Sequence, residues 1–267
     1  MIRKYTVQGA CVDVECLVMG LLENNVYLIG DGSATFVVDP TCNAPAILEA
    51  LGERKLAAIV LTHHHSDHMG AAAALREATG ATVIASSVEA PLVENPKKVG
   101  MSPLPLPDAC PVDYPVDDGD VVQIGNMAWK VLLTPGHSKG GMCWYMVPQF
   151  GNHADGAPVL VSGDTLFAGT TGRTDFEGGS VEDMQASMIR LALLPDEPRP
   201  WVLHVFLDRH ECFAQYYGYT FRKRFGWPPP AAWAAAGVLS LTATKFTRSA
   251  EAIQPWDSTS AWIRGRA

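Results

Sequence analysis

The chain has 267 residues and a hydrophobic content of 48%, so it is long enough to bury a substantial core as one large domain. Its 28 acidic and 20 basic residues give a net charge of −8, which argues against a nucleic-acid partner. No apolar run reaches the roughly 18 residues of a membrane span, and the 6 cysteines form no C-x-x-C pair, so we expect a cytoplasmic protein with reduced thiols and no membrane partner.

The first third of the chain alternates strands with helices. The opening residues M-I-R-K-Y-T-V-Q are typical of a strand and not of a signal peptide. Apolar patterning predicts further strands at 11–19, 26–29, 35–38, 56–61 and 81–85. Helices are predicted at 44–51 and 71–78, and each is followed by a glycine that ends it. This order is that of an α/β fold.

The stretch from Leu61 to Met69 reads L-T-H-H-H-S-D-H-M and directly follows the strand at 56–61. It holds four histidines and one aspartate, and it lies at the carboxyl end of a strand, where open α/β sheets bind ligands. Imidazole nitrogens and carboxylate oxygens suit Zn²⁺, Fe²⁺ and Mn²⁺. The stretch therefore predicts a metal site.

The remaining elements place three more candidate ligands after strands. We expect a long, proline-rich surface loop at 91–115 that could cover the substrate, then strands at 121–124, 127–133, 142–147, 159–161 and 201–204. A glycine-rich loop at 169–179 precedes a helix at 181–193. Three of these strands end near His137, Asp164 and His204. Each residue alone has an ordinary structural explanation, but together they predict one shared site.

These motifs resemble those of the metallo-β-lactamase fold superfamily. The resemblance rests on H-x-H-x-D-H (63–68), P-G-H (135–137) and S-G-D-T-L-F (162–167). The runs N-N-V-Y-L-I-G-D (24–31) and R-T-D-F-x-G-G (173–179) are similar to those of its hydroxyacylglutathione hydrolase (glyoxalase II)-like branch, short bacterial type. The resemblance covers roughly residues 11–204. It implies an α/β fold, a four-layer αβ/βα sandwich with a metal cleft at the strand ends.

The resemblance also implies a set of metal ligands for two ions, with Zn²⁺ expected and iron or manganese as alternatives. One ion would bind His63, His65 and His137, and the other would bind Asp67, His68 and a last histidine, with Asp164 bridging both. The position of that last histidine falls on His204, although Val202-Leu203 replaces the usual Pro-Gly; His210 is the alternative. His64 occupies a variable position and is left out.

The chemistry implied is hydrolysis of a small thioester or ester of the hydroxyacylglutathione type. Two ions about 3.5–4 Å apart lower the pKa of a shared water from about 15.7 to about 7, which supplies hydroxide at neutral pH. Asp67 and Asp164 would orient it as catalytic residues. Lys139 and Arg173 are candidate contacts for an anionic substrate, but Arg173 is better suited to an ion pair with Asp175.

Two alternatives stay open on the sequence. One is a persulfide (sulfur) dioxygenase, which resembles this chain in His63, His65, His137 and Asp164 and uses a single iron. The other is a non-catalytic relic with an impaired second metal site. An intact second set of ligands favours the hydrolase over both.

Charge divides the chain near residue 204. Residues 1–204 hold 12 basic and 24 acidic side chains, a net of −12, whereas residues 205–267 hold 8 and 4, a net of +4. We expect 1–204 to form the metallo-β-lactamase-like domain and 205–267 to be an atypical, divergent tail that is disordered in part. A shift of reading frame near Pro198 is the alternative explanation for the tail.

Overall fold

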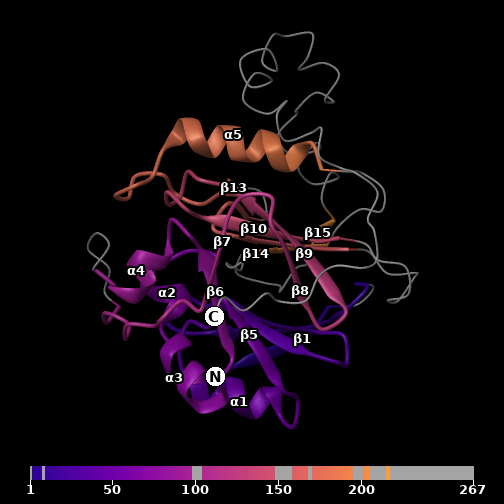
Figure 1. Cartoon of the computed structure of the whole chain (residues 1–267). Coiled ribbons are helices and arrows are strands. Elements are labelled where there is room, and N and C mark those ends of the chain that lie inside the picture. Colours follow the sequence, from indigo (N-terminus) through magenta and orange to yellow (C-terminus); the bar gives the residue numbers. More distant parts are fainter. Residues whose placement is uncertain are drawn as a thin grey trace, which may run out of the picture.

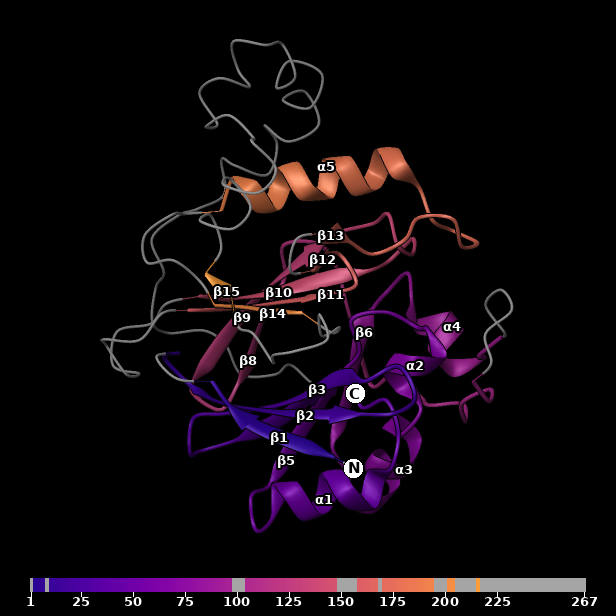
Figure 2. The same cartoon turned by 180° about the vertical axis from the view of Figure 1, so that it is seen from behind.

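The computed structural model describes residues 2–7, 10–97, 104–147, 158–167, 170–194, 201–204 and 215–216. These residues form two β-sheets that face each other, with helices on both outer faces (Figures 1 and 2). This is the four-layer αβ/βα sandwich that the resemblance implies. The helices are α1 (Ala44–Leu51), α2 (Ser66–Met69), α3 (Ala72–Thr79), α4 (Ala90–Glu94) and α5 (Val181–Ala192).

The first sheet has seven strands in sequence order. Its strands are β1 (Arg3–Thr6), β2 (Asp13–Met19), β3 (Asn24–Gly30), β4 (Thr35–Val38), β5 (Leu56–Val60), β6 (Thr82–Ser86) and β7 (Tyr114–Val116). The first four are antiparallel, and β4 to β7 run parallel. The carboxyl ends of β4, β5, β6 and β7 therefore share one edge of the sheet.

The second sheet has six strands in the order β15-β14-β11-β10-β9-β8. Its strands are β8 (Val121–Ile124), β9 (Met127–Leu133), β10 (Met142–Val147), β11 (Val159–Gly163), β14 (Trp201–His204) and β15 (Gln215–Tyr216). A small separate pair, β12 (Leu166–Phe167) and β13 (Thr170–Thr171), follows β11. The predicted strands and the helix at 181–193 are confirmed within a few residues.

Apolar side chains fill three layers. Between the sheets, Phe36 meets the indole of Trp129 edge-on, with 5.2 Å between ring centroids, and Trp144 packs beside both. Outside the first sheet, α1 and α3 bury Ile47 and Leu75 against it. Outside the second, α5 buries a separate apolar cluster. The core thus fixes the two sheets relative to each other, and the predicted ligands lie along one edge of them.

The prediction of an unstructured loop at 91–115 is wrong in part. Helix α4 begins at Ala90 with Pro91 in its first turn, a position at which proline is tolerated because no helical N–H is needed there. Strand β7 contains Pro115 and, among the described strands, pairs with β6 alone, so it lies at the edge of the described sheet, where proline is also tolerated. The density of prolines predicted a loop, but Pro91 and Pro115 both lie at positions where a helix or a strand tolerates proline.

The predicted tail lies almost wholly outside the described residues. Of residues 205–267, only Gln215–Tyr216 is described; it pairs with β14 in the second sheet. His210 and the proposed domain boundary therefore stay predictions. Across the part of the chain that is described, every helix is too short or too polar to cross a bilayer.

Candidate metal centre

The structure brings six of the seven predicted ligands together at the strand ends. His63 and His65 follow β5, and Asp67 and His68 lie on the short helix α2. From the second sheet, His137 follows β9 and Asp164 follows β11. All six except Asp67 are buried. Buried polar side chains require hydrogen-bond or metal partners. Both sheets thus contribute to one cluster.

Three imidazoles form the first group. The Nε2 atom of His63 lies 3.0 Å from Nδ1 of His65, and Nε2 of His137 lies 2.8 Å from the same Nδ1. One ring nitrogen from each of the three histidines falls within 4.8 Å of the others. These three histidines are the residues predicted to form the first metal site.

The second group surrounds His68. Its Nε2 atom lies 3.4 Å from Oδ2 of Asp67 and 3.5 Å from Oδ1 of Asp164. The other carboxylate oxygen of Asp164 lies 3.2 Å from Nε2 of His137. Asp164 therefore stands between the two groups, where a bridging ligand would have to be.

The last predicted ligand is placed only by its backbone. Strand β14 runs parallel to β11 and sets His204 opposite Gly163, which precedes Asp164. The side chain of His204 lies outside the described residues. The pairing puts His204 at the correct strand end, and its role as a ligand stays a prediction.

Asp39 is a site residue that the sequence analysis missed. It is fully buried at the end of β4, and its Oδ2 accepts from the hydroxyl of Thr62 at 2.6 Å and faces Nδ1 of His68 at 3.0 Å. Its Oδ1 accepts from the Thr62 N–H at 2.7 Å. A carboxylate on the far nitrogen of a histidine fixes the ring and leaves the other nitrogen for a metal. Asp39 also falls in a group with His63 and His68 that could hold an ion. Its bonds to Thr62 and its contact with His68 suit it better to positioning the His68 ring.

Helix α5 and the loop after β13 orient His137. The Nδ1 atom of His137 bonds to the carbonyl of Arg173 at 2.7 Å, which directs Nε2 into the cluster. Gly136 has a φ of +138° and lies so close to α5 that a Cβ would be 2.5 Å from the backbone of Met184. Only glycine fits here. The Ser180 N–H also donates to the Gly136 carbonyl, so the start of α5 fixes the loop that carries His137.

Glu89 joins the two histidine-bearing loops, and nothing in the sequence signalled it. Its side chain is fully buried at the start of α4. Its Oε1 accepts from the Ser138 hydroxyl at 2.8 Å and the Gly140 N–H at 2.7 Å. Its Oε2 bonds to both the backbone N–H and Nδ1 of His64. His64 is thus a structural member of the site and not a member of either convergent group.

The electrostatics of the first group favour uncharged imidazoles. Burial lowers the pKa of His65 to about 2 and that of His137 to about 4, and it lowers the pKa of His63 as well. Neutral imidazole is the form that binds a metal. Burial would also lower the pKa of His68, but the carboxylates of Asp164 and Asp67 raise it well above its usual value.

The donor set fits a cation. Burial raises the pKa of Asp164 to about 7, because its carboxylate is placed among other acidic groups and away from water. Its Oδ1 is buried without a hydrogen-bond partner among the described groups. Buried, unsatisfied carboxylate oxygens are rare unless an ion or water completes them. Positive charge at this point would satisfy Asp164 and relieve its repulsion by Asp67.

The predicted ion pair of Arg173 with Asp175 is present. Two bonds of 2.7 Å join the guanidinium to the carboxylate, and both side chains are largely exposed. The guanidinium also lies 4.2 Å from the ring centre of Phe176, which packs edge-on against the rings of His65 and His137. Phe176 therefore shields the first group of imidazoles from water, and Arg173 holds Phe176 in place.

Known proteins are similar to this chain in sequence. A family model described as the metallo-beta-lactamase superfamily matches residues 19–201. The hydroxyacylglutathione hydrolase of Pseudomonas entomophila (strain L48) is 35% identical over 199 residues, which cover 72% of this chain and 66% of that enzyme. The chain thus spans slightly less than two thirds of that relative's length.

Solved structures agree with the sequence matches. The crystal structure of BLEG-1 B3 metallo-beta-lactamase gives a TM-score of 0.64 at 29% identity, covering 73% of this chain and 91% of that one. A structure of TTHA1623 in a di-iron-bound form gives a TM-score of 0.57 at 30% identity, covering 71% of this chain and 90% of that one. The family match includes every candidate ligand except His204.

Proposed function

This chain belongs to the metallo-beta-lactamase superfamily, as a hydrolase with a His/Asp metal site, and we propose that it cleaves a small thioester or ester of the hydroxyacylglutathione type. The observation that carries the proposal is the pair of adjoining groups, three imidazoles on one side and His68 with Asp67 on the other, with Asp164 between them. The similarity to hydroxyacylglutathione hydrolases supports the substrate class.

In this proposal His63, His65 and His137 hold one ion, and Asp67 and His68 hold a second with Asp164 shared. His204 is the proposed last ligand. Zn²⁺ is the expected metal, because nitrogen and carboxylate ligands suit it, and iron or manganese would fit the same donors. Divalent ions held there would lower the pKa of water to about 7 and polarise the substrate carbonyl.

The protein's own groups prepare the site for this reaction. Asp39 fixes the ring of His68, and the Arg173 carbonyl fixes that of His137, so both present Nε2 to the cluster. Phe176 limits the access of water to the first group of imidazoles. In the hydrolysis, the carbonyl carbon gains an oxygen from water as its bond to sulfur breaks. A thiol, with an ordinary pKa of about 8.5, leaves without help from an acid.

The test combines metal content with turnover. The full chain is purified without chelator, its metals are measured by elemental analysis, and hydrolysis of S-lactoylglutathione is followed in the same preparation. We expect about two ions per chain, with activity that is lost to a chelator and restored by Zn²⁺. One iron per chain without hydrolysis would contradict the proposal and favour persulfide dioxygenation. Absence of metal would indicate a non-catalytic relic.

A further inference from the structure

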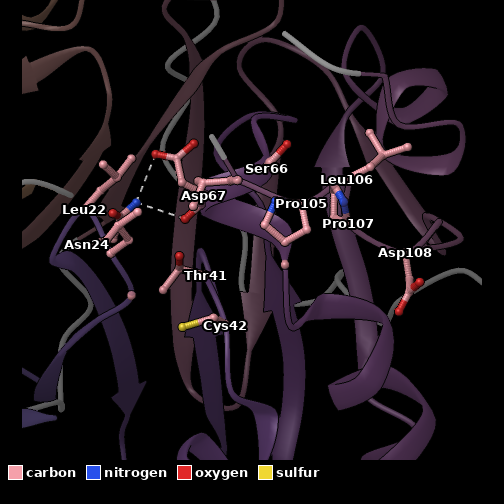
Figure 3. Close-up of a pocket in the computed structure, with 14 residues that line it drawn as sticks. Leu22, Asn24, Thr41, Cys42, Ser66, Asp67, Pro105, Leu106, Pro107 and Asp108 are labelled. Carbon is pink, nitrogen blue, oxygen red and sulfur yellow. Dashed lines mark hydrogen bonds between the residues drawn. The ribbon is translucent and has the colours of Figure 1, made fainter. Parts of the chain in front are cut away.

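A second feature adjoins the metal centre, a pocket of about 340 Å³. Its walls come from four segments: the β2–β3 turn, the residues after β4, the start of α2, and residues 104–108. In Figure 3, Leu22 and Asn24 lie on one side of Asp67, and Pro105 and Leu106 lie on the other. Pockets for small molecules span about 300–1,000 Å³, so this one is large enough for a short chain.

Exposed leucines surround this pocket. Leu21 is 73% exposed, Leu22 is 42% exposed and Leu106 is 48% exposed, and all three line it. Exposing large apolar side chains to water costs free energy, and their gathering around one hollow is typical of a binding site. Prolines 105 and 107 extend the apolar wall. The lining is therefore suited to a hydrocarbon group.

The charges of the lining disfavour an anion. Its described residues include two carboxylates, Asp67 and Asp108, and neither lysine nor arginine. Cys42, also in the wall, is kept as a neutral thiol, because burial raises its pKa. Away from the end at which Asp67 meets the metal centre, an anionic group would face the Asp108 carboxylate and no lysine or arginine of the lining. The leucines and prolines of the wall favour an uncharged, apolar group.

Asp67 connects the pocket to the metal centre. Asn24 donates to the Asp67 carbonyl at 2.9 Å and to its Oδ2 at 3.2 Å, as the dashed lines of Figure 3 show. The same Oδ2 lies 3.4 Å from Nε2 of His68. One side chain is therefore both a wall of the pocket and a member of the cluster. A ligand in the pocket would have one end beside the reacting bond.

We propose that this pocket binds the acyl chain of the substrate, and that this chain is aliphatic, uncharged and longer than a lactoyl group. The inference rests on the proposed thioester hydrolysis. The acyl side is favoured over the thiol side because a glutathione carrier bears carboxylates, which the lining disfavours. On hydrolysis the new carboxylate forms at the metal end of the chain, and the hydrocarbon stays in the pocket until the acid leaves.

The first test varies the acyl chain on a constant carrier. Hydrolysis of acetyl-, butanoyl- and hexanoylglutathione is measured with the metal-loaded full chain, with S-lactoylglutathione as the reference. A buried methylene is worth about fourfold in binding, so kcat/KM should rise about 16-fold from butanoyl to hexanoyl. Values that stay flat or fall with chain length would overturn the proposal, as would a dependence on the chain of the thiol instead.

The second test changes the pocket wall. Leu106→Asp, or Leu22→Asp, should lower the ratio of kcat/KM for hexanoyl over acetyl by about tenfold, because a charge replaces apolar contact. The control is Val121→Asp on β8, a residue of similar exposure (45%) in the other sheet, which should leave the ratio unchanged. An unchanged ratio in both leucine variants would overturn the proposal.

The third test separates binding from turnover. Hexanamide and acetamide are neutral probes of different chain length, and their binding is followed by NMR titration. Hexanamide has four more methylenes than acetamide, so it should saturate the protein at concentrations about 250-fold lower, and Leu106→Asp should reduce this difference by about tenfold. Selective binding of hexanamide without hydrolysis of any thioester would leave the pocket assigned and refute the proposed function. Thioester hydrolysis without selective binding would refute the pocket alone.

Discussion

Replacing Glu89 should weaken both the fold and the metal site, because this one carboxylate joins the loops that carry the first group of histidines. In Glu89→Ala, the Ser138 hydroxyl and the Gly140 and His64 N–H groups lose their acceptor. A buried donor without a partner costs about 1–3 kcal/mol. Water entering the space would recover part of this, so we expect the free energy of unfolding to fall by about 3–5 kcal/mol.

Glu89→Gln separates the shape of the side chain from its charge. The glutamine amide keeps one oxygen as an acceptor. In either of its two orientations, however, its NH₂ group would face hydrogen-bond donors instead of acceptors. Bonds from His64 and Ser138 outweigh burial and hold the pKa of Glu89 below its usual value, so the wild-type residue is ionised and only accepts. We expect a loss of about 1–2 kcal/mol in stability and a roughly tenfold loss in zinc affinity.

Both variants are measured in the same two assays. Urea unfolding followed by tryptophan fluorescence gives stability, and competition with a chromophoric chelator gives the zinc dissociation constant. Glu77→Ala, an exposed position on α3, is the matched control and should change neither. The reasoning would be refuted if Glu89→Ala unfolded within about 1 kcal/mol of wild type and bound zinc as tightly.

Three further variants test separate parts of the molecule. His65→Ala should reduce the metal content from about two ions to about one and lower hydrolysis by more than about 100-fold, measured by elemental analysis and turnover; unchanged metal content would contradict the ligand assignment. Asp39→Asn should lower zinc affinity by about 10–100-fold, since its amide cannot replace the carboxylate that faces His68; a chelator competition showing wild-type affinity would argue against positioning. The Arg76 guanidinium lowers the pKa of Asp113, so this contribution to stability is present above the ordinary pKa of about 3.9 and is lost as pH falls through the lower folded value. Asp113→Asn should therefore destabilise the fold by about 0.5–1 kcal/mol at pH 7, and this difference should vanish in strong acid. Urea unfolding at several pH values measures the difference. A difference that stays constant with pH would contradict the prediction.

Much of the fold could be predicted because its signals are local. Short apolar runs such as 56–60 and 159–161 have the length of strands and are too short for typical helices, and helix α1 is bounded by Asn43 and Gly52. The strand-end placement of the candidate ligands follows from the same logic, since chain order and hydrophobic pattern predict the strands that they follow. Their division between two ions came from the resemblance to the family.

The rest of the site depends on contacts between distant segments. Glu89 and Ser138 are 49 positions apart, and no periodicity or motif connects them. Asp39 had a usable signal, because it ends β4 next to β5 and precedes a proline, but it reads equally well as a turn residue. The exposed leucines of the pocket come from two loops, the β2–β3 turn and residues 104–108, and loops have no pattern that predicts which of them meet.

The division of ligands between the sheets has a consequence for assembly. Three histidines come from the first sheet, while His137 and Asp164 come from the second, and the paired tryptophans lie between. An ion bound by both would act as a cross-link between the two halves of the sandwich. This cross-link could form only once they have docked. Tight binding would then slow the separation of the halves, and chelation would expose the protein to proteolysis along the seam between them.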